Sequence, residues 1–290
     1  MPGAYSEEAA ETMFSSCVPQ ACEQFQSAFE AVERWLADRA LLPVENSLGG
    51  SIHKNYDLLL RHRLHIVSEI NFKVQHCLLV KPGVTLEHVS RVISHPQALS
   101  QCEEYLASLN CVQEAWDDTA GAAKAVADCD SNDVAAIASA KAANLYGLEM
   151  LRSGIQDDPD NITRFIALGR EPATLQSGAQ HKTCIVFSLR EGPGVLFRAL
   201  SCFALRDIDL TKIESRPLRS RPISLLDPQV EDGSGKSANG SEIRFSYLFY
   251  IDCLSGTHER TTQNALRHLD EYATYLRVLG SYPVENVPNH

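Results

Sequence analysis

The spacing of apolar residues changes repeatedly between helix-like and strand-like along the first half of the chain. After the Ser27–Glu30 capping box, Phe29, Val32 and Leu36 recur at helical intervals, which predicts an amphipathic helix reaching about Asp38. Short apolar runs bounded by polar or Gly-containing loops predict strands between the helices. The expected strands are 40–44, two within 65–80, 89–93, 112–116 and 134–137, and the expected helices are 52–60, 96–109, 119–128 and 139–146. This alternation predicts α/β lobes with a partly parallel sheet.

A second block of elements follows a polar stretch at 171–181, which contains Pro and Gly and predicts a linker. Beyond it, Leu196, Leu200 and Phe203 mark one face of a helix. The expected order is strand 183–189, that helix, strand 208–213, strand 243–252, helix 257–271 and strand 275–279. This βαββαβ order predicts a ferredoxin-like domain. Gly, Ser and Asn dominate 232–240, so 218–241 is expected to be a flexible insertion.

Length and composition indicate a globular protein with more than one domain. A chain of 290 residues lies at the upper end of what one core holds together, so two domains are expected. The apolar fraction of 44% and the charged fraction of 22% are typical of globular proteins. The formal net charge of -11 argues against nucleic acid or an anionic membrane as the main partner. No apolar run approaches the roughly 20 residues of a membrane span.

The nine cysteines and ten histidines are dispersed along the chain. No two cysteines are spaced as CxxC, and an odd count in a long chain favours reduced thiols over a disulfide framework. His53, His62 and His65 are close in sequence, but no carboxylate or thiol at a ligand spacing completes a zinc motif. The sequence therefore predicts neither a disulfide framework nor a metal site.

The most informative stretch is the polar loop 157–161 and the apolar run that follows it. Thr163 and Arg164 stand at the start of that run, where a loop gives way to an expected strand and functional side chains are often presented. Glu45, Asn46 and Ser47 follow another expected strand and lead into a Gly-rich loop, the usual ligand position in open α/β sheets. The residues alone leave structural alternatives open. Thr163 could simply be a β-branched strand residue, and Arg164 could form a surface ion pair. Asn46 and Ser47 could be helix caps.

Five short motifs occur in the order and rough spacing of the prephenate and arogenate dehydratases, and the chain resembles that family over nearly its whole length. They are Leu42–Ser47, Ser94–Ala98, Thr163–Phe165, Gly194–Leu196 and Glu214–Pro217. The last two lie in the second block, which is similar to the ACT domains that sense amino acids. The run 46–57 and the closing 276–283 resemble the plant arogenate dehydratases, which are plastid enzymes. The resemblance therefore implies a place in the chloroplast stroma.

The resemblance also implies a domain organisation. A catalytic domain of two α/β lobes, like those of periplasmic binding proteins, is expected at 1–170, a linker at 171–181 and a ferredoxin-like ACT regulatory domain at 182–290. Gly3–Glu7 is similar to the segment that follows the first strand in the family, so we expect that strand to be missing from this chain.

The implied reaction removes a ring hydroxyl and a carboxylate from a cyclohexadienyl acid. Because aromatisation drives it, no cofactor and no metal are expected. Thr163 is expected to be the catalytic hydrogen-bond donor to the departing hydroxyl, and Arg164 to hold a carboxylate. The residues expected to bind substrate are Glu45, Asn46, Ser47, Ser94, Gln97, Thr119, Arg164 and Phe165. Phenylalanine is the expected effector of a homo-oligomer, bound by Gly194, Val195, Leu196, Glu214, Ser215, Arg216 and Pro217.

Two alternatives stay open from the sequence. Arogenate carries an amine where prephenate carries a ketone, so the substrate depends on whether a carboxylate, with Glu45 as one candidate, faces that position. The plant-like motifs favour arogenate. The other alternative is a non-catalytic phenylalanine sensor, against which the intact Thr163–Phe165 and Glu45–Ser47 motifs argue.

Overall fold

The computed structural model describes residues 1–176, 178–217 and 247–284. The expected insertion at 218–241 lies outside these described residues. The chain divides into two compact units, which we describe separately. Unit 1 comprises 1–28, 41–53 and 70–165, and unit 2 comprises 29–40, 54–69 and 166–290.

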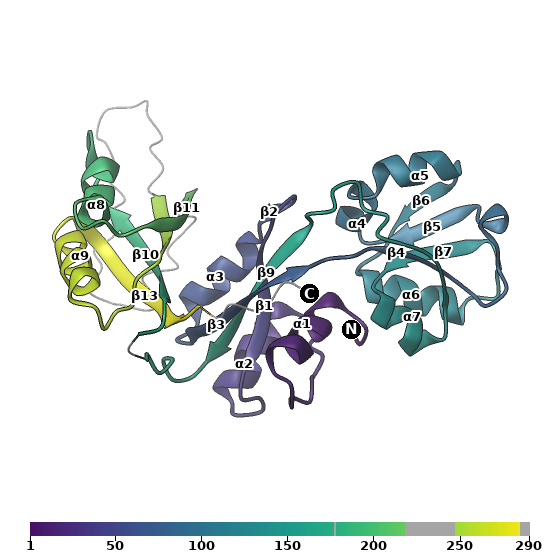
Figure 1. The fold of residues 1–290 in the computed structure, drawn as a ribbon, viewed down its shortest axis with the longest axis horizontal. Helices are drawn as coiled ribbons and strands as arrows, with labels where there is room; N and C mark the ends of the chain where they lie inside the picture. Colours follow the sequence, from purple (N-terminus) through teal and green to yellow (C-terminus); the bar gives the residue numbers. More distant parts are fainter. Residues whose placement is uncertain (177, 218–246, 285–290) are drawn as a thin grey trace, which may run out of the picture. The chain divides into compact units, whose positions relative to one another are not determined.

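A five-stranded mixed sheet forms the centre of unit 1 (Figure 1). Its strand order is β6-β5-β7-β4-β8, with β5 parallel to β6 and β7, and β4 antiparallel to β7 and β8. The strands are β4 (Cys77–Val80), β5 (Arg91–Ser94), β6 (Val112–Ala115), β7 (Val134–Ala138) and β8 (Glu149–Ser153). The partly parallel sheet that the alternation of elements predicts is confirmed.

Helices cover both faces of this sheet because neighbouring strand residues point to opposite sides. Leu78 and Ile137 pack toward α4 (Pro96–Ser100) and α5 (Glu103–Leu109), through contacts that include the buried Leu106. Leu79 and Ala136 pack toward α6 (Thr119–Asp128) and α7 (Ala140–Tyr146) on the other face. A short 3₁₀ helix, η1 (Leu86–His88), connects β4 to β5.

Strands from the beginning and the end of the predicted catalytic region pair in a second, four-stranded sheet. Its order is β2-β1-β9-β3. The strands are β1 (Ala40–Asn46), β2 (Gly50–Ser51), β3 (His65–Lys73) and β9 (Ile162–Gly169), and the helices beside them in sequence are α1 (Tyr5–Met13), α2 (Phe25–Glu33) and α3 (His53–Arg61). Thr163 and Arg164 lie at the start of β9, as the sequence predicts.

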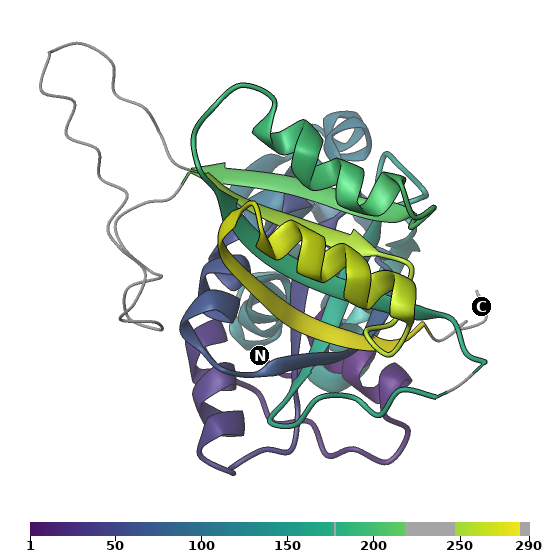
Figure 2. The ribbon, with the colours of Figure 1, turned by 90° about the vertical axis from the view of Figure 1, so that its left-hand side faces the viewer.

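The second half of the chain has the six expected elements in the expected order. They are β10 (His181–Leu189), α8 (Val195–Ala204), β11 (Leu210–Pro217), β12 (Tyr247–Cys253), α9 (Arg260–Asp270) and β13 (Ala273–Pro283). The strands form one sheet in the order β11-β12-β10-β13, and every neighbouring pair is antiparallel. Figure 2 shows α8 and α9 side by side on one face of this sheet. Phe187, Phe203 and Leu269 are buried between them.

The structure differs from the sequence predictions at three places. Helix α2 ends at Glu33 rather than near Asp38, because Trp35 takes a left-handed conformation with φ of 62°, and Ser27 lies inside the helix rather than at its cap. The single helix expected at 96–109 is divided into α4 and α5, with the buried Cys102 at the junction. Strand β8 was not predicted, because it is an edge strand with largely exposed polar residues and little periodic apolar signal.

Candidate active site

Asn46 is the centre of a buried hydrogen-bonded group in unit 1. It is the last residue of β1 and is 6% exposed. Its Oδ1 accepts hydrogen bonds from the backbone N–H groups of Leu48 (3.1 Å) and Gly49 (2.7 Å). Its Nδ2 donates to Thr163 Oγ1 at 3.0 Å and to Asn161 Oδ1 at 2.7 Å. The structure therefore brings together two of the residues that the sequence singles out.

Ser47 ties the loop after β1 to the start of β9. Its hydroxyl donates to the Asp160 carbonyl at 3.0 Å and accepts from the Ile162 N–H at 3.0 Å. The Ser47 N–H also donates to the Ile162 carbonyl at 2.8 Å. Ser47 thus fixes the Leu42–Ser47 motif next to the Thr163–Phe165 motif.

Arg164 and Glu45 lie beside this group as a loose ion pair. Arg164 Nη1 is 3.9 Å from Glu45 Oε2, and the side chains are 12% and 36% exposed respectively. The guanidinium is therefore partly shielded from water and next to a carboxylate. Phe165, the third residue of the motif, is buried with Ala9 and Ile70 in a hydrophobic cluster.

Ser94 and Thr119 lie outside the Asn46 group in the described part of the chain. Ser94, at the end of β5, is fully buried, and its hydroxyl donates to the Ile137 carbonyl at 2.6 Å. Thr119 is the first residue of α6, whose N-cap is Asp118, with its carboxylate accepting from the Gly121 N–H at 2.8 Å. The local structure accounts for both positions without reference to a ligand.

A small pocket opens next to Asn46. Its volume is about 250 Å³, slightly below the usual range for ligand sites. Its lining residues are Leu48, Gly49, Gln97, Ser100, Gln101, Asp157 and Asp158. Gln101 connects the pocket to the buried group, because its Nε2 donates to Asn46 Oδ1 at 3.2 Å. Of the residues predicted to bind substrate, Gln97 is in the pocket wall.

Sequence reasoning missed four members of the group, which are Tyr5, His76, Gln101 and Asn161. Gln101 Oε1 accepts from Asn161 Nδ2 at 3.1 Å and lies 2.9 Å from His76 Nε2. Tyr5 Oη is 2.9 Å from His76 Nδ1. The polar loop before Thr163 offered a signal for Asn161, but nothing in the local sequence links His76 to Gln101, which lies 25 positions further along the chain.

Burial favours the uncharged forms of the two ring side chains. Desolvation lowers the pKa of His76, partly offset by its hydrogen bond to Gln101. Desolvation, helped by neighbouring Cys77 and Glu8, raises the pKa of Tyr5 well above its ordinary value. The group therefore works as a neutral hydrogen-bonding network near pH 7.

The predicted effector residues share one end of the unit 2 sheet. Gly194, with φ of 73°, caps α8 just after β10, and Glu214–Pro217 are the last residues of β11. Both strands are antiparallel to β12, so they run in the same direction and end at the same edge. There, Arg216 Nη1 and Nη2 donate to Asp57 Oδ1 and Oδ2 at 2.5 and 3.3 Å.

One group of side chains in the described residues has metal-ligand chemistry. His181, His258 and Glu259 place their ligand atoms within 4.8 Å of one another, at the start of β10. Two of these side chains already have protein partners. His181 Nε2 accepts from the Gln176 N–H at 3.3 Å, and Glu259 Oε1 from the Gly256 N–H at 2.7 Å.

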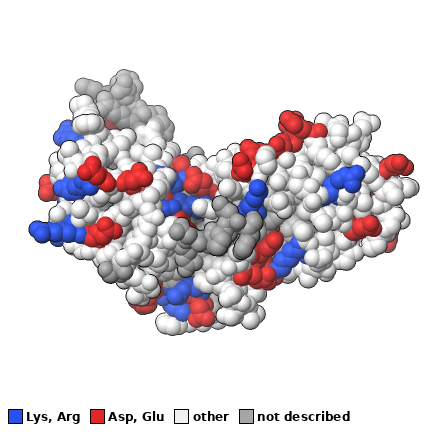
Figure 3. All heavy atoms as spheres, viewed as in Figure 1, with Lys and Arg blue, Asp and Glu red and all other residues white. Residues whose placement is uncertain are grey.

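Charge and hydropathy add little to the site. Acidic and basic side chains are interspersed over the face shown in Figure 3. Within the described ranges, no helix has the length and apolar character needed to cross a bilayer.

The fold and this site define an α/β protein in which residues at strand ends form a buried group of a hydroxyl and side-chain amides. Gln101 joins this group to a small pocket, an arrangement suited to a small polar ligand. The model of the prephenate dehydratase family matches residues 1–173. The chain belongs to the prephenate dehydratase family.

Similar proteins are known from plants and bacteria. Arogenate dehydratase/prephenate dehydratase 2, chloroplastic, of Arabidopsis thaliana is 58% identical over 98% of this chain and 71% of its own length. Arogenate dehydratase 2 of Petunia hybrida is 57% identical over 98% and 70%. A prephenate dehydratase from Arthrobacter aurescens, solved in complex with L-Phe, has a TM-score of 0.83 at 28% identity, covering 98% of this chain and 88% of that one. A protein described as the quorum quenching acylase GqqA also has a TM-score of 0.83, at 31% identity and coverages of 100% and 97%.

Proposed function

We propose that the protein is an arogenate dehydratase, a carbon–oxygen lyase that converts L-arogenate to L-phenylalanine with loss of carbon dioxide and water. The observation that carries the proposal is the contact of Thr163 Oγ1 with the Asn46 amide at 3.0 Å, in a chain of this family. Relatives named as arogenate dehydratases are 51–58% identical over 98–99% of the chain, which favours arogenate over prephenate as the substrate.

Thr163 is proposed as the catalytic residue. Because its oxygen accepts from Asn46 Nδ2, its own proton is directed to another acceptor, and the departing hydroxyl of the substrate is that acceptor. A threonine hydroxyl is a weak acid, so it acts as an oriented hydrogen bond rather than as a strong proton donor. The carbon–carbon bond to the ring carboxylate breaks and carbon dioxide is released. Its electron pair completes the aromatic ring, and the departing hydroxide takes up one proton from the solvent to give water.

Charged and polar neighbours of Thr163 are proposed to hold the substrate. Arg164 pairs with a substrate carboxylate, because a guanidinium forms charge-assisted bidentate hydrogen bonds with that group. Glu45, 3.9 Å from Arg164, orients it and supplies the negative charge that an amino group needs. The other proposed substrate-binding residues are Asn46, Ser47, Ser94, Gln97, Thr119 and Phe165, and we propose no cofactor.

The proposed organisation is a catalytic domain at 1–170, a linker at 171–181 and an ACT regulatory domain at 182–290. The family match at 1–173 supports the first boundary. The sheet order β11-β12-β10-β13, with α8 and α9 on one face, supports a ferredoxin-like ACT domain. The pairing of early and late strands in one sheet supports a two-lobed catalytic domain of the periplasmic-binding-protein type.

Phenylalanine is the proposed effector, bound between copies of this chain by Gly194–Leu196 and Glu214–Pro217. Their shared sheet edge supports this, and the Arthrobacter relative was solved with L-Phe. The proposed location is the chloroplast stroma, since several relatives are named as chloroplastic.

The test is a turnover assay with arogenate and with prephenate, following phenylalanine and phenylpyruvate. We expect phenylalanine from arogenate, inhibited by added phenylalanine. Thr163→Val is expected to lower kcat by about 100-fold or more, as for the loss of one transition-state hydrogen bond. Thr12→Val, on the exposed side of α1, is the matched control. Near-wild-type turnover in Thr163→Val refutes its role, and phenylalanine binding without product from either substrate indicates a sensor.

A further inference from the structure

We propose that His76 is a positioning residue for the reaction: with its proton on Nε2, it holds Gln101 and, through Gln101, the Asn46 amide that contacts Thr163. The inference rests on the proposed function and concerns a residue outside all five sequence motifs. His76 lies directly before β4 and is 2% exposed. It never contacts Thr163, so its influence passes through the side chains between them.

The direction of the network is determined at Asn46. Backbone N–H groups only donate, so the two that face Asn46, from Leu48 and Gly49, require its oxygen Oδ1 on their side. Its Nδ2 therefore faces Thr163 and donates to Oγ1. This assignment of oxygen and nitrogen follows from the backbone.

Gln101 passes this direction on to His76. Its Nε2 lies 3.2 Å from Asn46 Oδ1, so its Oε1 points the opposite way. There, Oε1 accepts from Asn161 Nδ2 at 3.1 Å and lies 2.9 Å from His76 Nε2. An amide oxygen attracts donors, so His76 must carry its proton on Nε2.

The contact with Tyr5 on the other side of the ring agrees with this assignment. With the proton on Nε2, His76 Nδ1 is an acceptor, and Tyr5 Oη lies 2.9 Å from it. The Tyr5 hydroxyl also lies 2.9 Å from the Gln75 carbonyl, which is a second acceptor for the same proton. The Tyr5 and His76 rings meet edge to face, with centroids 5.6 Å apart.

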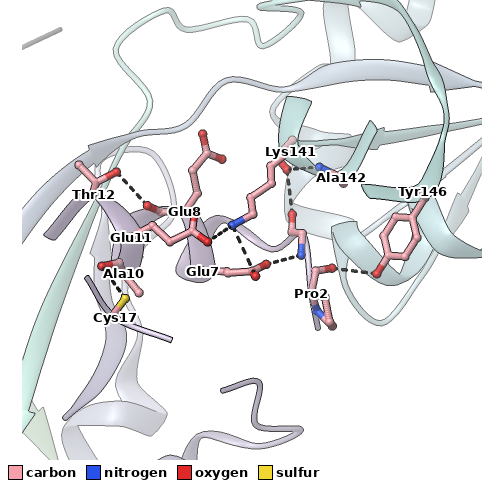
Figure 4. Close-up of polar contacts among 12 residues, drawn as sticks. Pro2, Glu7, Glu8, Ala10, Glu11, Thr12, Cys17, Lys141, Ala142 and Tyr146 are labelled. Carbon is pink, nitrogen blue, oxygen red and sulfur yellow. Dashed lines mark hydrogen bonds and ion pairs between the residues drawn. The ribbon is translucent and has the colours of Figure 1, made fainter. Parts of the chain in front are cut away.

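The backbone before Tyr5 is anchored to α7, so the hydroxyl has a defined position. Tyr146 Oη donates to the Pro2 carbonyl at 2.8 Å (Figure 4), and Ser139 Oγ donates to the Gly3 carbonyl at 2.8 Å. Gly3 packs directly against α7, and its φ of 83° suits glycine.

The network transmits orientation and delivers no proton. Two side-chain amides, those of Gln101 and Asn46, separate His76 from Thr163, and an amide holds its protons firmly near neutral pH. A replacement for His76 therefore needs the same polarity: a donor toward Gln101 and an acceptor toward Tyr5. Glutamine offers this arrangement in a neutral side chain, whereas leucine fills similar space and offers neither group.

The kinetic test compares His76→Leu with His76→Gln, using arogenate. If His76 orients Thr163, His76→Leu lowers kcat by about 30-fold or more with KM within about 3-fold, and His76→Gln stays within about 5-fold of wild-type kcat. His181, which is 1% exposed and lies in unit 2, is the control, and its Leu and Gln variants should not differ in kcat. Equal losses in both His76 variants, or a kcat within 2-fold of wild type in His76→Leu, overturn the proposal.

The tautomer is measured by ¹⁵N NMR of histidine-labelled protein, with His76 assigned by the signal lost in His76→Gln. We expect the proton on Nε2 near pH 7, and a proton on Nδ1 overturns the proposal. Tyr5→Phe is a milder variant that removes only the hydroxyl, and it is expected to mix the tautomers and lower kcat by about 3- to 10-fold. If the wild-type protein converts neither arogenate nor prephenate, the proposed function fails, while the tautomer still decides the assignment of His76.

Discussion

The ion pair between Arg216 and Asp57 should stabilise unit 2 measurably. Arg216, in the proposed effector motif on β11, makes two parallel contacts with the Asp57 carboxylate on α3, at 2.5 and 3.3 Å. The Arg216 side chain is only 15% exposed, but Asp57 is 46% exposed, so water screens part of the interaction. Bidentate geometry raises the coupling above that of an ordinary surface pair, to about 1–2 kcal/mol.

A double-mutant cycle of Arg216→Ala, Asp57→Ala and the double variant measures this coupling from urea unfolding. We expect Asp57→Ala to cost more than Arg216→Ala, because it removes the carboxylate from a largely buried guanidinium and leaves that charge in place. Arg216→Ala instead leaves the Asp57 carboxylate, which water already reaches.

The control cycle uses Arg91 and Glu114 in unit 1, which are 3.1 Å apart with both side chains 45% exposed. That exposed pair should couple by no more than about 0.5 kcal/mol. A coupling for Arg216 and Asp57 equal to that of the control pair would refute the reasoning from burial and bidentate geometry. Unchanged phenylalanine inhibition in Arg216→Ala would in turn remove Arg216 from the effector site.

Three further predictions concern packing and pH. Gly280→Ala should lower the free energy of unfolding by about 3 kcal/mol or more, because its Cβ would lie 2.1 Å from the Ile66 carbonyl oxygen. Thermal unfolding measures this loss, and a melting temperature within about 2 °C of wild type would contradict the prediction. Gly49→Ala, whose Cβ would lie 2.0 Å from Gln97 Nε2, should raise KM about 3- to 10-fold with little loss of stability, and an unchanged KM would separate Gln97 from the substrate. Burial lowers the pKa of His76 and of His65, so below about pH 6.5 the unfolded chain binds more protons than the folded protein, and stability should fall with the pH. Urea unfolding at pH 5.5 and 7.5 should show a smaller fall in His76→Gln than in the wild type, and an equal fall in both would refute the assignment.

Local sequence determined most elements of the fold. Helix α6 spans Thr119–Asp128 as predicted, because an Ala-rich run with a buried face follows an aspartate cap. The position of Thr163 at the start of β9 also followed from a polar loop that meets an apolar run. The end of α2 and the division between α4 and α5 did not follow, since a left-handed Trp35 and a buried Cys102 depend on packing rather than on periodicity.

The candidate site shows the same division. The sequence by itself pointed to Asn46 and Thr163 through the loops and motifs that contain them, and the resemblance of those motifs led to the family. Only the tertiary structure placed Tyr5, His76 and Gln101 in one chain of hydrogen bonds, because contacts between residues 71 and 25 positions apart depend on how strands and helices pack. A tautomer is decided by neighbours in space, and no local pattern in the sequence records them.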